Sequence, residues 1–225
     1  MMRPRVVCGV LGVWLLAAAP VAWARDDFQT WNTVDVSTQL TPSLSLFVTP
    51  QVRIRDDSTT LQYHEYRQGI RWKPSPHLQL GLNYLFVRNA ASGKPLEEHS
   101  GELDVTPKTT VGPVEASLRW RLALRTIQGS SGEQEWQMRV MPKLAYPLKA
   151  AGRTITPYMA DDLFYDATRA AWNQNRVFLG AVVPLKAWAH AKVSLDVYYM
   201  LQSALGKRHD WSSTHILGTT LSLQF

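Results

Sequence analysis

Apolar and polar residues alternate along most of this chain with a period of two. In the segment 114–125, every even-numbered position is apolar, and every odd-numbered position except Ala123 is polar or charged. A β-strand points successive side chains to opposite faces, so this segment predicts a strand with one apolar and one arginine-rich face. The segment exceeds the usual soluble strand of about 5–6 residues and suits a tilted membrane strand of about 9–11.

Ten other segments show the same alternation, and no long segment has a helical period. The clear ones are 44–55, 78–86, 136–146, 191–202 and 217–225, and the weaker ones are 28–40, 61–72, 103–111, 154–165 and 173–183. Tight turns are expected at 41–43, 74–77 and 112–113, between longer polar connections. Short turns at one rim and longer loops at the other are typical of outer-membrane barrels, with the short turns periplasmic.

The sequence therefore predicts an all-β protein, a single antiparallel transmembrane up-and-down β-barrel. The candidates number eleven, whereas single-chain bacterial barrels usually have an even number of strands. We therefore expect twelve strands, with ten as the alternative.

The first 24 residues have the layout of a cleaved signal peptide. Arg3 and Arg5 precede an apolar run, and a small-x-small triplet ends at Ala24. The expected domains are thus a signal peptide over 1–24 and an outer-membrane barrel over 25–225. Cleavage would remove the single cysteine and lower the formal charge from +6 to +4. This modest charge has no basic run, which argues against nucleic-acid binding.

The aromatic residues and the C-terminus fit a bacterial outer membrane. Tryptophans are expected near one rim (Trp31, Trp136, Trp172 and Trp211) and near the other (Trp72 and Trp188), as in two interfacial girdles, although aromatic residues favour strands in general. A terminal phenylalanine, Phe225, closes an alternating strand and resembles the signal read by the outer-membrane insertion machinery. The expected partners are that machinery and outer-membrane lipids, and the sequence leaves the oligomeric state open.

The main architectural rival is a soluble periplasmic β-sandwich or lipocalin-like binding protein. Its strands would alternate too, but with the apolar face inward. Strand length, the tryptophan positions and Phe225 favour the membrane barrel.

Four groups of residues form a recognisable series: Arg119-Trp120-Arg121, then Pro157-Tyr158 with Asp161-Asp162-Leu163-Phe164-Tyr165, then Trp172-Asn173-Gln174-Asn175-Arg176 with Gly180, and then Tyr198-Tyr199. The order of these motifs resembles the domain-of-unknown-function 2490 family of predicted outer-membrane proteins, over nearly the whole mature chain. Asp162 stands where the family pattern suggests Glu. The resemblance implies a barrel and its location, and no reaction.

Alternation places an unusual set of charges on the inward faces. The bases are Arg53, Arg55, Arg67, Arg71, Arg119, Arg121, Arg125, Arg139, Lys143 and Arg176, and the acids are Glu65, Glu102, Asp104, Glu115, Asp162 and Asp196. They predict either a narrow, arginine-lined passive pore for small solutes, anions among them, or a packed lumen in which the charges neutralise one another.

Catalysis and loop-mediated adhesion are weaker hypotheses. Ser213 and His215 share one face of a strand, which would suit an outer-membrane lipid hydrolase, but no third orienting residue is evident by motif. The histidines lack metal-ligand spacing and no phosphate-binding loop follows a strand, so no metal and no cofactor are expected. The modest loops disfavour a surface receptor. We expect a protein that is not an enzyme.

Overall fold

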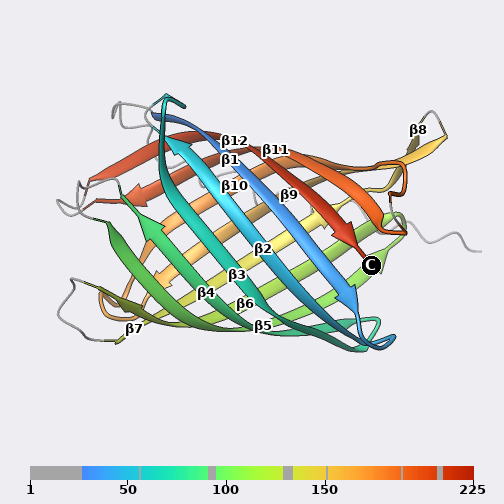
Figure 1. The fold of residues 1–225 in the computed structure, drawn as a ribbon, viewed down its shortest axis with the longest axis horizontal. Helices are drawn as coiled ribbons and strands as arrows, with labels where there is room; N and C mark the ends of the chain where they lie inside the picture. Colours follow the sequence, from blue (N-terminus) through green and yellow to red (C-terminus); the bar gives the residue numbers. More distant parts are fainter. Residues whose placement is uncertain are drawn as a thin grey trace, which may run out of the picture.

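The computed structural model describes residues 27–55, 57–90, 95–128, 134–150, 152–188, 190–206 and 210–225. The expected signal peptide over 1–24 lies outside these residues. The chain forms strands throughout (Figure 1), and the described residues include no helix that is long and apolar enough to cross a membrane. The strands are β1 (Asp27–Gln39), β2 (Leu44–Arg55), β3 (Thr60–Ser75), β4 (Leu78–Asn89), β5 (Leu96–Val111), β6 (Val114–Ile127), β7 (Gln134–Ala145), β8 (Leu148–Ala150), β9 (Arg153–Asp166), β10 (Ala171–Pro184), β11 (Lys192–Leu205) and β12 (Trp211–Gln224).

Eleven of these strands close into a barrel. Each pairs with its neighbour in sequence order, with β9 taking the place beside β7, and β12 returns to pair with β1. The short β8 lies outside the ring and pairs only with the start of β9, in the hairpin that projects beyond the barrel in Figure 1.

The closing seam between β1 and β12 is parallel, whereas the other barrel pairs are antiparallel. Its register runs from Asp27 opposite Thr214 to Ser37 opposite Gln224. Beyond the strand, the Gln39 N–H donates to the Phe225 carbonyl at 3.0 Å. The C-terminus is therefore bonded to the end of the first strand.

The expected counts of twelve and ten barrel strands are wrong, and so is the purely antiparallel sheet. Each of the eleven sequence candidates is a barrel strand, and 28–40, one of the weaker ones, is the full-length β1. With an odd number of up-and-down strands, the first and last run in the same direction, so the ring can close only with a parallel pair. The even-number rule assumes antiparallel closure.

Two rims follow from this topology. The C-terminal rim holds the end of β12 and the tight turns β1–β2, β3–β4 and β5–β6, and the opposite rim holds the start of β1. The expected contrast in loop length is weaker than predicted. At the rim expected to carry the longer loops, two connections are short, since β5 already begins at Leu96 and β12 at Trp211. At the C-terminal rim, which was expected to carry only tight turns, the connection 185–191 is longer.

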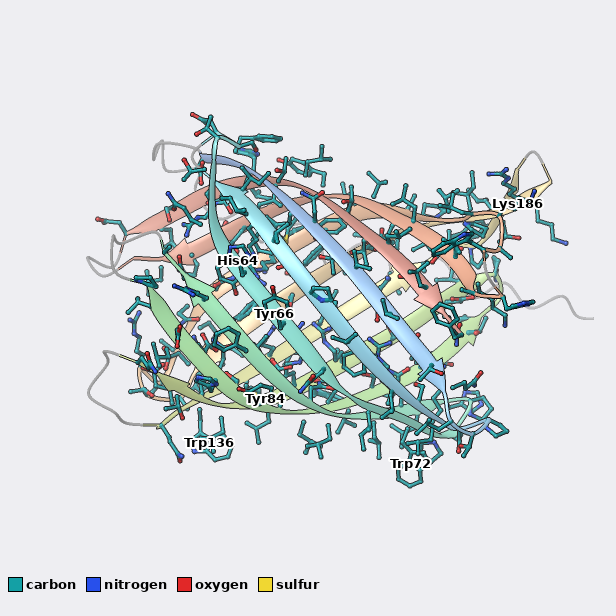
Figure 2. All side chains as sticks on the ribbon, in the orientation of Figure 1. His64, Tyr66, Trp72, Tyr84, Trp136 and Lys186 are labelled. Atoms are coloured by element: carbon teal, nitrogen blue, oxygen red, sulfur yellow. The ribbon has the colours of Figure 1, made fainter. Side chains whose placement is uncertain are left out.

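The barrel carries its charges inside and its apolar side chains outside. Arg121, Glu102 and Asp162 are at most 4 % exposed, whereas Leu82 and Leu179 are more than half exposed. In Figure 2, Trp72 and Trp136 point outward near opposite rims. The exposed outer tryptophans at strand ends also include Trp172, Trp188 and Trp211.

Trp31 is an exception to the expected girdles. It shares its face of β1 with Thr33 and lies inside the barrel, 4 % exposed. Its Nε1 donates to Gln29 Oε1 at 3.0 Å, and the Arg53 guanidinium lies 3.7 Å from its ring centroid. Its assignment to a girdle was wrong because nearness to a strand end does not determine the face.

Small residues on the β10–β12 wall make room for two inward tyrosines. The Tyr198 ring lies over Gly218, where a Cβ atom would collide with it, and the Tyr158 ring lies 2.7 Å from the ideal Cβ position of Gly180. Both tyrosines belong to the apolar cluster that also contains Trp31, Met200 and Ile216. These contacts hold the tyrosines flat against the wall and leave space in the lumen.

Candidate functional site

One half of the lumen is crossed by a chain of alternating bases and acids. Arg53 binds Glu65 at 2.8 Å, Glu65 binds Arg67 at 2.9 Å, and Arg67 binds Glu102 at 2.9 Å. Glu102 also binds Arg121 at 3.1 Å, and Arg121 binds Asp104 at 2.6 Å. Three bases and three acids therefore neutralise one another.

Strand register sets the strongest link of this ion-pair chain. Asp104 lies directly opposite Arg121 in the β5–β6 ladder. Arg121 donates through Nε to Oδ1 at 2.6 Å and through Nη2 to Oδ2 at 2.7 Å, which is the two-pronged geometry that a guanidinium and a carboxylate favour. This part of the lumen fits the expected packed interior, in which the charges neutralise one another.

The other half of the lumen has more bases than acids. Asp162, whose side chain is 1 % exposed, is shared by Arg119 at 3.4 Å and by Arg139, which donates to it through Nε at 3.4 Å and also through Nη2. Arg119 also donates to the Met141 sulfur at 3.1 Å. One carboxylate thus serves two guanidinium groups.

Two further bases face neutral partners. The Arg176 Nε donates to Gln202 Oε1 at 2.9 Å, and its guanidinium lies 4.6 Å from the Phe164 ring centroid. The Lys143 Nζ lies 3.7 Å from the Tyr158 ring centroid. Neither base has a carboxylate within ion-pair distance in the described part of the chain. We call Arg119, Arg139, Lys143 and Arg176 the cation cluster.

The remaining predicted charges are spread along the wall. Arg71 pairs with Asp35 at 3.1 Å, and Arg125 pairs with Glu98 at 2.8 Å and with Glu135 at 3.7 Å. Asp196 accepts from the Tyr158 hydroxyl at 3.0 Å. Arg55 is half-buried at the end of β2, and Glu115 is exposed beside a cavity near the C-terminal rim.

Three of these acids, Asp35, Glu98 and Glu135, were not among the predicted inward charges. Asp35 shares its face with Trp31 and Thr33 on the weakly alternating β1, and Glu98 lies in a stretch expected to be a loop. Extending the alternation of Glu102 and Asp104 backward would have found Glu98.

Three cavities remain between these side chains. The central cavity measures about 340 Å³ and is lined by eight bases and only four acids. The rim cavity, about 600 Å³, lies among the tight turns of the C-terminal rim, and the side cavity, about 370 Å³, lies along the inner faces of β1 to β6, with contributions from β11 and β12. The lumen is therefore neither filled completely nor electrically neutral.

The catalytic candidates Ser213 and His215 lie on the outer face of β12, the face that bears the exposed Leu217. A hydrogen bond of 2.5 Å joins His215 Nδ1 to the Tyr199 hydroxyl on β11. The same arrangement recurs between His99 Nδ1 and Tyr84, at 2.6 Å. Each of these two outward Tyr–His pairs joins neighbouring strands, which suits a structural role in the barrel wall. Within the described residues, no group of three or more His, Cys, Asp or Glu side chains could hold a metal ion.

These features define a closed β-barrel with a polar, arginine-rich lumen and an apolar outer wall. The chain belongs to the family described as protein of unknown function (DUF2490), whose model matches residues 28–213. The match confirms the resemblance drawn from the motifs. No curated protein and no solved structure matches the chain.

Proposed function

We propose that this protein is an outer-membrane β-barrel whose lumen passes small anions by diffusion. The observation that carries the proposal is the inverted polarity of the barrel, with charges inside and apolar side chains outside. An exposed apolar band around a polar interior suits a hydrocarbon surrounding. A soluble lipocalin-like protein would need the opposite arrangement.

The preference for anions follows from the central cavity. Its bases outnumber its acids two to one, and among the described residues Arg176 and Lys143 contact neutral partners and have no carboxylate within ion-pair distance. Rings of one charge in a narrow passage favour ions of the opposite sign. The three cavities share wall residues, which supports a narrow route and argues against a wide pore.

The location is tested by fractionation, followed by electrophoresis with and without boiling. We expect the protein in the outer-membrane fraction, with a band whose mobility changes on heating. A soluble periplasmic protein without such a change would overturn the proposed location.

The transport role is tested in planar bilayers that contain the purified barrel. Under a KCl gradient, the reversal potential should show that chloride is more permeant than potassium, and Arg176→Gln should lower that preference. A barrel that does not conduct, or that prefers potassium, would contradict the anion pore.

A further inference from the structure

Arg119 lies where the three cavities meet, since it lines all of them. Met141 and Lys143 line both the central cavity and the rim cavity. The direct route between these two cavities therefore runs along Arg119, Met141 and Lys143. We call these three residues the junction.

Arg119 has an unused donor at this place. Its Nε is buried and has no hydrogen-bond partner in the part of the chain that the structure describes, while its Nη2 is committed to Asp162 and Met141. A buried charged donor is strongly favoured to find an acceptor. The carboxylates of the opposite half, Glu65, Glu102 and Asp104, bind Arg53, Arg67 and Arg121 instead.

Lys143 supplies a second positive group at the junction. It projects from β7, two residues beyond Met141, and rests on the Tyr158 ring. An ammonium on an aromatic face keeps N–H donors for another partner. Tyr158 is held in turn by its bond to Asp196 and by its close approach to Gly180.

We propose that the junction is a saturable binding site for a small oxyanion of the phosphate class. The Arg119 guanidinium and the Lys143 Nζ would donate to different oxygens of one tetrahedral anion, which presents several strong acceptors. Chloride would neutralise the same charge but would not offer separate oxygens to the two donors. The inference rests on the proposed function only for the route by which the anion arrives.

The test measures binding of inorganic phosphate to the full barrel in detergent by calorimetry, in a chloride background. We expect saturable binding at one site. Lys143→Gln and Arg119→Gln should each weaken it by about tenfold or more. Arg55→Gln is the matched control: it also removes one positive charge from the barrel, but Arg55 lines none of the three cavities. Its phosphate affinity should stay within about twofold of the original.

Heat-dependent electrophoretic mobility shows whether each variant is folded, and Lys143→Gln keeps the test valid if Arg119→Gln does not fold. Absence of saturable phosphate binding, or equal losses in Lys143→Gln and Arg55→Gln, would overturn the junction site. Phosphate binding by a barrel that does not conduct would overturn the pore and leave the site standing. Conduction without phosphate binding would do the reverse.

Discussion

Glu102 binds two guanidinium groups, those of Arg67 and Arg121, and its side chain is only 2 % exposed. Removing one partner of a buried ion pair leaves an uncompensated charge and costs about 3–5 kcal/mol. We therefore expect Glu102→Gln to lower the free energy of unfolding by about that amount, measured by urea unfolding of the folded barrel in lipid vesicles. Glu115→Gln, at an exposed position by the rim cavity, is the control, and an equal loss there would contradict the assigned role of Glu102.

At the same residue scale, the sequence predicted which charges share the inward faces but not which of them pair. Arg121 binds Asp104 because the β5–β6 register places them opposite one another. Alternation gives the face of a residue, whereas register depends on the neighbouring strand. For the same reason, the unequal sharing of Asp162 between Arg119 and Arg139 could not be read from the sequence.

At the scale of the elements, the closing seam makes the sharpest prediction. Asn32 lies opposite Thr219, and Val36 lies opposite Leu223. Paired Cα atoms in adjacent strands fall within disulfide range. In a variant without Cys8, the double substitutions Asn32→Cys with Thr219→Cys and Val36→Cys with Leu223→Cys should both cross-link, as seen in non-reducing electrophoresis.

The control for the seam is Val36→Cys with His215→Cys. An antiparallel seam that pairs Asn32 with Thr219 would bring Val36 to His215, so cross-linking of this pair, in place of Val36 with Leu223, would refute the parallel closure. The sequence identified the strands themselves because long alternation is a local property. The alternation gave all eleven strands of the ring, and only the even-number rule led to twelve or ten, because the way in which the ring closes is a property of the whole sheet.

At the scale of the whole molecule, the two ends of the barrel chain lie at opposite rims. β1 starts at the rim opposite the end of β12. If the C-terminal rim is periplasmic, an epitope placed just ahead of Asp27 should be detected by antibody on intact cells. An epitope in the Gly112–Pro113 turn should be detected only after the cells are opened. Equal detection of both on intact cells would contradict this orientation.

The parallel seam also has a consequence for how such a barrel is assembled. If the barrel spans the outer membrane as proposed, the connections at the rim opposite the C-terminus let β2–β3, β4–β5, β6–β7, β9–β10 and β11–β12 each cross the bilayer as one hairpin. β1 has no such partner at that rim and would cross as a single strand, bonded to β2 on one edge and to β12 on the other. The wall is complete only when β1 and β12, the first and last strands of the sequence, have paired.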